Sequence, residues 1–208
     1  MESCDFSEGN LHIRVRKIDI SHPNDEHKKF AIKGGSDYDG VSNMYGHFVA
    51  ISAKVLSFVA PNKFYEYLFQ MLDLNLKDIP PEKQVKIGYV VENPINNEWI
   101  GTISLINYVG KNLEQYAEKK LLEIGLYIYP EYRRKGYVKT FYRRVIDFIL
   151  DSNKEIVNDA IICFTPGSTN TAMKNVANMI GARYIKQEEE TIDFTIMKRK
   201  FMVDLYFL

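Results

Sequence analysis

Residues 121–150, LLEIGLYIYPEYRRKGYVKTFYRRVIDFIL, constrain the fold more than any other stretch. Alternating apolar residues from 122 to 128 predict a strand, and Pro130 ends it because proline has no N–H for a sheet ladder. Helically spaced apolar residues after position 138 predict an amphipathic helix. A basic loop, RRKG at 133–136, lies between them. Because the free N–H groups and dipole of a helix N-terminus bind anions, we expect a diphosphate site here.

The overall charge makes this basic loop informative. The chain has 208 residues, with 27 Lys and Arg against 27 Asp and Glu. No global field therefore attracts nucleic acid or an anionic membrane, and we expect neither as a partner. Anion binding must depend on local groups. The alternative is that the basic side chains only form the solvated start of a helix.

Neither a membrane segment nor a metal site is expected. The longest apolar region, residues 48–60, contains Lys54 and is shorter than the ~20 residues that a spanning helix needs. The N-terminus lacks a signal-peptide pattern, and two cysteines cannot form a disulfide framework, so we expect a cytoplasmic protein. The four histidines all lie in the N-terminal quarter and lack metal-ligand spacing.

The remaining patterns predict one domain over residues 1–208. Residues 1–45 read as an N-terminal strand (11–20) and an irregular segment. A helix over 48–59 should bury Val55 and Val59 on one face, and Ser168 or Thr169 should cap a later helix. Residues 188–190 read as an acidic turn between two short strands. The apolar tail, residues 201–208, packs either on the domain or against a second copy in a homodimer. The other expected strands cover 85–91, 100–105, 122–128 and 157–164, and a second helix runs from 62 to Pro80-Pro81.

Four sequence segments follow one another along the chain: Trp99 to Leu105, Glu123 to Arg133, the loop Arg133-x-x-Gly136-x-Val138, and Asn170 to Gly181. Together they resemble the Gcn5-related N-acetyltransferase (GNAT) superfamily, in which they match the third strand, the fourth strand, the R/Q-x-x-G-x-G/A phosphate loop and an Asn-containing helix. The resemblance covers most of the chain after about residue 85. It implies a single-domain α/β (α+β) fold whose mainly antiparallel central sheet is flanked by helices and splayed at the fourth and fifth strands.

The resemblance also implies an activity. The chain would be an acetyl-CoA-dependent N-acetyltransferase that uses no metal and moves an acetyl group to a primary amine of a small molecule or a protein. Backbone groups near Leu126, Tyr127 and Ile128 would hold the pantetheine arm and the oxyanion, and Asn170 would contact the pantetheine or thiol end. The residues implied around the diphosphate are Arg133, Arg134, Lys135, Gly136, Tyr137, Val138 and Lys139.

Three departures from the family pattern bear on mechanism. Val138 stands where glycine or alanine is usual, and Ala177 stands where many members place a tyrosine that protonates the thiolate. Thr165 lies near the place of a glutamate that other members use as base. Glu123 is then the best candidate base, although an alternating strand equally places such a residue on a solvated face. Rival readings are a non-catalytic acyl-CoA-binding module and a nucleotide-binding protein.

Overall fold

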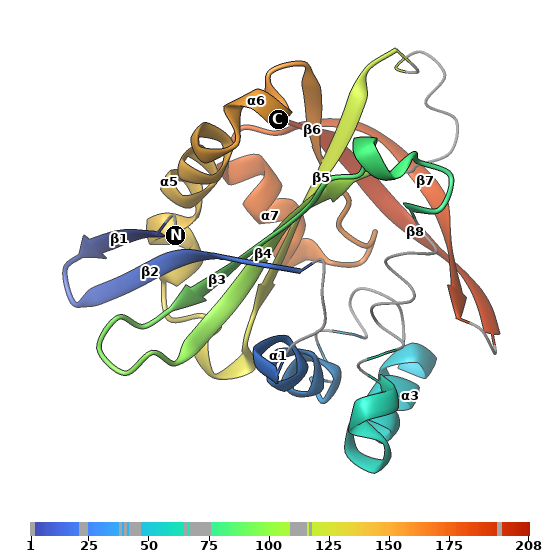
Figure 1. The fold of residues 1–208 in the computed structure, drawn as a ribbon, viewed down its shortest axis with the longest axis horizontal. Coiled ribbons are helices and arrows are strands. Elements are labelled where there is room, and N and C mark those ends of the chain that lie inside the picture. Colours follow the sequence, from blue (N-terminus) through green and yellow to red (C-terminus); the bar gives the residue numbers. More distant parts are fainter. Residues whose placement is uncertain are drawn as a thin grey trace.

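The computed structural model describes residues 3–20, 25–37, 39, 41, 47–64, 66, 76–108, 116, 118–194 and 197–208. Their strands form one 8-stranded sheet in the order β1-β2-β3-β4-β5-β6-β8-β7 (Figure 1). Only the β5–β6 pairing is parallel. The strands are β1 (Ser3–Glu8), β2 (Leu11–Ile18), β3 (Lys86–Glu92), β4 (Trp99–Asn107), β5 (Lys120–Ile128), β6 (Ala160–Phe164), β7 (Arg183–Phe194) and β8 (Met197–Phe207).

Helices lie on both sides of this sheet. They are α1 (Asp25–Gly35), α3 (His47–Val59), α5 (Tyr137–Ser152), α6 (Lys154–Val157) and α7 (Thr171–Met179), with 3₁₀ turns η1 (Pro81–Lys83) and η3 (Pro130–Tyr132). The expected mainly antiparallel sheet flanked by helices is confirmed. The main core lies between the sheet and α5, where Leu122 and Ile124 of β5 and Phe141 and Val145 of α5 are almost fully buried. Since side chains alternate along a strand, the odd-numbered residues of β5 face the other side, where α1 and α3 lie (Figure 1).

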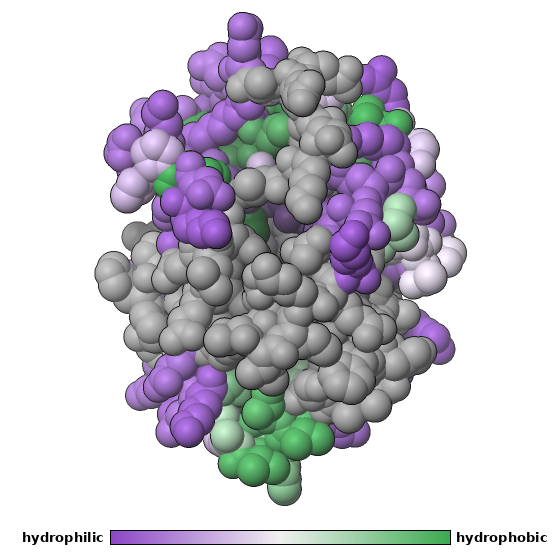
Figure 2. Space-filling model, turned by 90° about the vertical axis from the view of Figure 1, so that its right-hand side faces the viewer, coloured by the Kyte–Doolittle hydropathy of each residue, from purple (hydrophilic) through white to green (hydrophobic). Residues whose placement is uncertain are grey.

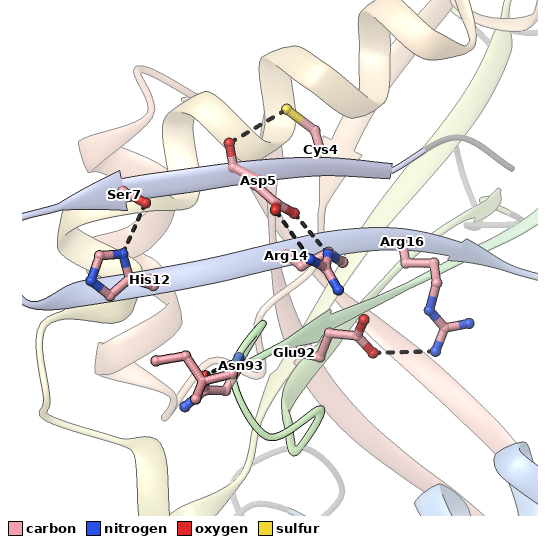
Figure 3. Close-up of polar contacts among 9 residues, drawn as sticks. Cys4, Asp5, Ser7, His12, Arg14, Arg16, Glu92 and Asn93 are labelled. Carbon is pink, nitrogen blue, oxygen red and sulfur yellow. Dashed lines mark hydrogen bonds and ion pairs between the residues drawn. The ribbon is translucent and has the colours of Figure 1, made fainter.

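Polar contacts fix the N-terminal hairpin on the sheet (Figure 3). Arg14 of β2 donates to Asp5 of β1 through Nε at 2.8 Å and through Nη2 at 3.2 Å. Nη2 of Arg16 lies 3.3 Å from Oε2 of Glu92 on β3. The register places Asp5 directly opposite Arg14, whereas Arg16 and Glu92 are diagonal neighbours, because Glu92 lies opposite Arg14.

The N-terminal region departs from expectation in three ways. One strand was expected, but β1 and β2 form a hairpin. The segment expected as irregular contains α1, in which Gly35 is required for packing: a Cβ there would lie 2.3 Å from Cε1 of Phe64. In α3, Val55 and Val59 are 54 % and 73 % exposed, so the predicted buried face was wrong. Apolar residues surround most of α3, and periodicity could not choose its face. Residues 67–75 of the second expected helix lie outside the described residues.

The C-terminal region also differs. β7 runs unbroken through residues 188–190, so the expected acidic turn was wrong. Its register pairs Glu188 with Val203 and Glu190 with Phe201. The apolar tail belongs to β8, an interior strand between β6 and β7, so it packs on its own domain. The run of three Glu residues did not indicate a strand, because acidic residues are disfavoured in strands unless other residues pair with them.

A pair of leucines tests the position of this tail. Leu205 is fully buried in β8, whereas Leu208, just beyond it, is 38 % exposed. We expect Leu205→Ala to lower the free energy of unfolding by about 2–5 kcal/mol and Leu208→Ala by less than about 1 kcal/mol. Urea denaturation of both variants measures this, and equal effects would contradict the burial of the tail.

Candidate active site

The strand β5 has an open edge. It pairs with β6 only from Lys120 to Glu123, and β6 pairs with β8 along its other edge. On its other side β5 pairs with β4 up to Ile128. β5, which corresponds to the family's fourth strand, and β6 therefore splay apart after Glu123, as the resemblance implies. We call the space between them the opening, and Glu123 lies at its apex.

Hydrogen bonds at the two ends of the β4–β5 ladder fix which backbone groups face this opening. Tyr108 N donates to Leu121 O at 2.9 Å, and Tyr129 N donates to Ile100 O at 3.0 Å. Because such pairs alternate in an antiparallel ladder, odd-numbered residues, including Tyr127, direct N–H and C=O to β4. Ile124, Leu126 and Ile128 direct theirs into the opening. Of the three residues expected to offer backbone groups, Leu126 and Ile128 are placed to do so.

The loop before α5 has the geometry of an anion site. Arg134 and Gly136 both have left-handed backbone, with φ +60° and +90°. This conformation is uncommon for a residue other than glycine, and it helps successive N–H groups to line a concave surface. Gly136 is the N-cap of α5 and makes no side-chain cap hydrogen bond. The N–H groups of Tyr137, Val138 and Lys139 are therefore those that an anion would satisfy.

The side chains of the loop divide into two groups. Arg134, Lys135 and Lys139 are exposed. Val138 instead packs toward the core, where it lines a shallow apolar cavity with Leu126 and Ile128. Its branched side chain is therefore accommodated on the core side of α5, while its N–H stays in the first turn.

The side chain of Arg133 makes hydrogen bonds within the protein. Its Nε donates to Ile128 O at 2.9 Å, and Nη1 donates to Oδ1 of Asp37 at 3.2 Å. A third bond joins Nη2 to Oδ2 of Asp37. Tyr127 Oη also donates to Oδ2 of Asp37, at 2.8 Å. Direct contact between Arg133 and a phosphate stays a prediction. Its partner Asp37 could not be predicted from the sequence.

Asn170 is the N-cap of α7. Its side-chain oxygen accepts from Met173 N at 3.1 Å, so the expected caps, Ser168 and Thr169, were wrong. The cap satisfies one of the free N–H groups of the first turn. Contact between Asn170 and the pantetheine arm stays a prediction.

Glu123 lies at the apex of the opening, on the face of β5 opposite α5. The hydroxyl of Thr165 donates to its carboxylate. Burial, followed by the nearby charge of Glu190, raises the pKa of Glu123 to about 7, and the Thr165 hydrogen bond acts in the lowering direction. A carboxyl group poised near neutral pH is suited to proton transfer.

A neighbouring cluster was missed in the sequence. The hydroxyl of Tyr108 contacts Oε1 of both Glu188 and Glu190, the latter at 2.8 Å. A phenol has one hydrogen, so both contacts are favourable only if one carboxyl group carries a proton. Burial and the charge of Glu188 raise the pKa of Glu190, whereas its hydrogen bond to Tyr108 lowers it; the resulting pKa is raised. The same-face spacing of Glu188 and Glu190 on one strand was the available signal.

Tyr142 of α5 lines the same cavity as Val138. Its hydroxyl is buried and makes no hydrogen bond with the described part of the chain. Burial raises the pKa of this phenol, which therefore stays protonated. Ala177, at the place of the missing tyrosine, is buried in the same core as Tyr142.

An open strand edge that ends at a helix start without a side-chain cap is suited to an extended, phosphate-bearing cofactor. Residues 57–183 match the family described as acetyltransferase (GNAT) domain. The chain belongs to this family, and it is an acetyl-CoA-dependent N-acetyltransferase. A search of curated proteins gave no match.

Solved structures share the fold. Spermidine N-acetyltransferase from Vibrio cholerae, in complex with CoA and spermine, is 18 % identical, with a TM-score of 0.54 and 94 % of both chains covered. A putative acetyltransferase from Salmonella typhimurium with its cofactor acetyl-CoA is 13 % identical, with a TM-score of 0.54 and coverage of 94 % of this chain and 92 % of that one. The ribosomal-protein-S5-alanine acetyltransferase from Vibrio fischeri is 14 % identical, with a TM-score of 0.50 and coverage of 97 % and 95 %.

Two searches for other kinds of site were negative. The His, Cys, Asp and Glu side chains that the structure describes form no group of three or more that could hold a metal ion. In the same part of the chain, no helix is both long and apolar enough to cross a membrane.

A matched pair of substitutions tests the loop. Gly136→Asn and Gly136→Asp introduce side chains of nearly equal size, and both residues tolerate left-handed backbone better than others do. Only Asp adds a negative charge beside the expected diphosphate. We expect Asp to weaken acetyl-CoA binding at least tenfold more than Asn, as measured by calorimetry. Equal affinities would show that no phosphate lies at this helix start.

Proposed function

We propose that acetyl-CoA lies along the open edge of β5, with its diphosphate on the first turn of α5, and that Glu123 is the general base for attack by a primary amine. The observation that carries this proposal is that the open edge of β5 continues into the first turn of α5. The outward backbone of Leu126 and Ile128 leads through η3 directly to the uncapped N–H groups of α5. An extended arm ending in a diphosphate fits that sequence of groups.

The chemistry follows from where these groups lie. Glu123 takes a proton from the ammonium form of the acceptor, directly or through water. The neutral nitrogen attacks the thioester carbon, and an outward N–H of β5 stabilises the tetrahedral oxyanion. Collapse breaks the C–S bond and releases the thiolate. The nitrogen loses its extra proton as the amide forms, and the thiolate gains one. We assign Tyr142, in place of the tyrosine that Ala177 replaces, to relay this proton, so that its hydroxyl is protonated before and after the step.

The acceptor should approach from the face of β5 that carries Glu123. Glu188 forms an ion pair with Lys186 (2.9 Å), and the negative charge that acts on Glu123 is that of Glu190. This charge favours an acceptor with several amines over a neutral one. The fold shared with a spermidine N-acetyltransferase is consistent with that class.

We also propose that residues 1–208 form a single domain and that two copies of the chain form a homodimer. The tail no longer supports a dimer, because it is buried in β8. The exposed apolar side of α3 does: Phe58 is 88 % exposed, and the lower end of the molecule in Figure 2 is apolar. Sedimentation at several concentrations tests this, and a monomer at all of them would contradict it.

The pH dependence of activity tests the base. Glu123 acts deprotonated, so kcat/KM should rise with pH through about 7 and then level off. Glu123→Gln should remove this rise and lower kcat by about 10²–10⁴-fold. Glu190→Gln removes a nearby negative charge, which makes ionisation of Glu123 easier, so the midpoint should move to lower pH. Thiol release with spermidine, a lysine peptide and an N-terminal alanine peptide as acceptors measures the rates.

Glu189→Gln is the matched control for the midpoint shift. Glu189 is the neighbour of Glu190 on β7, but its side chain is exposed and pairs with Lys200 at 2.7 Å. The midpoint of the pH profile of Glu189→Gln should equal that of the wild type. If Glu123→Gln retains the full rate and pH profile, Glu123 is not the base; acetyl-CoA binding without thiol release from any acceptor would indicate the non-catalytic alternative.

A further inference from the structure

The end of α1 is attached to the corner that follows β5. Asp37, two residues beyond α1, accepts hydrogen bonds from Tyr127 and from both terminal nitrogens of Arg133. Its side chain is only 4 % exposed, although it carries a charge. A buried carboxylate is retained where donors surround it, and these donors come from β5 and from the start of the cofactor loop.

A second group of contacts holds the same helix. Lys33 of α1 forms an ion pair with Glu131 of η3. Its Nζ also lies 3.9 Å from the centre of the Tyr129 ring. The last turns of α1 are therefore joined at two points to residues 127–133, the segment between the open edge and the phosphate loop.

Arg133 connects this attachment to the cofactor edge. The Ile128 carbonyl that accepts from its Nε is one of the groups directed into the opening beside β5. The next residue, Arg134, begins the left-handed part of the loop. A ligand that fixes the backbone from 128 to 136 therefore also fixes the guanidinium, and through it Asp37 and α1.

We propose that Asp37 is a positioning residue that links α1, on the acceptor side, to the cofactor edge through Arg133, so that bound acetyl-CoA orders α1 for the acceptor. This inference rests on the proposed function, because it assumes that acetyl-CoA occupies the edge of β5. Asp37 itself contacts neither the thioester nor the amine. Coupling of this kind is reciprocal, so bound acetyl-CoA and bound acceptor should each raise the affinity for the other.

Hydrogen exchange of the full chain, with acetyl-CoA as the only ligand, tests the link. In the wild type, acetyl-CoA should slow amide exchange in residues 25–35 by about fivefold or more, the lower end of usual coupling. Asp37→Asn keeps an oxygen that accepts from Tyr127 but loses the charge that holds Arg133. It should reduce this protection to less than about twofold, while acetyl-CoA affinity by calorimetry changes less than about threefold. Asp37→Glu should restore part of the protection.

Two further variants separate coupling from simple loss of stability. Asp147→Asn removes the ion pair of Asp147 with Arg143 (3.1 Å) on the outer surface of α5, and it should leave the protection of α1 unchanged. Arg133→Lys keeps the charge but loses the forked contacts with Asp37, and it should likewise reduce the protection of residues 25–35 to less than about twofold.

The outcomes are distinguishable. If the wild type does not bind acetyl-CoA, the proposed function fails and this inference fails with it. If acetyl-CoA binds but residues 25–35 gain no protection, only the coupling is overturned. Full protection in Asp37→Asn, or an equal loss in Asp147→Asn, would likewise overturn it.

Discussion

Parallel pairing between β5 and β6 stops at Glu123, while antiparallel pairing of β5 with β4 continues to Ile128. Backbone N–H and C=O groups need partners, and an edge that no strand covers invites a ligand to supply them. The crossover through α5 brings the chain from this edge to β6, and it places the first turn of α5 at the end of the opening. One topological feature thus produces both halves of the proposed cofactor site.

The same apex positions the chemistry. Glu123 is the last residue of β5 to pair with β6, and Thr165, beyond the end of β6, donates to its carboxylate. Burial alone would hold the carboxyl group protonated; the Thr165 hydrogen bond opposes this, and the pKa stays near neutral. A threonine near the family's alternative base position thus contacts Glu123, the carboxylate that we propose as base in a chain without that glutamate.

The sequence predicted the parts that local pattern determines. The strand 122–128, the helix after Gly136 and the strands 85–91 and 100–105 each have a clear period, and the structure contains all of these elements. Long-range partners were not predictable. Asp37 was assigned to an irregular segment, and Glu188 and Glu190 to a turn, because their hydrogen-bond donors lie 80 or more residues away in the sequence. The buried face of α3 and the direction of the Arg133 side chain likewise depend on neighbours that periodicity cannot show.

Amide NMR of the labelled chain tests the central claim, that acetyl-CoA occupies the open edge of β5, most directly. Acetyl-CoA should shift the signals of Leu126 and Ile128 and of the first turn of α5, residues 137–139. The Tyr127 signal should move less, because its N–H is directed to β4. ATP and NAD should not reproduce the shifts along β5. Saturable binding of acetyl-CoA that leaves the signals of Leu126 and Ile128 unchanged would contradict the account.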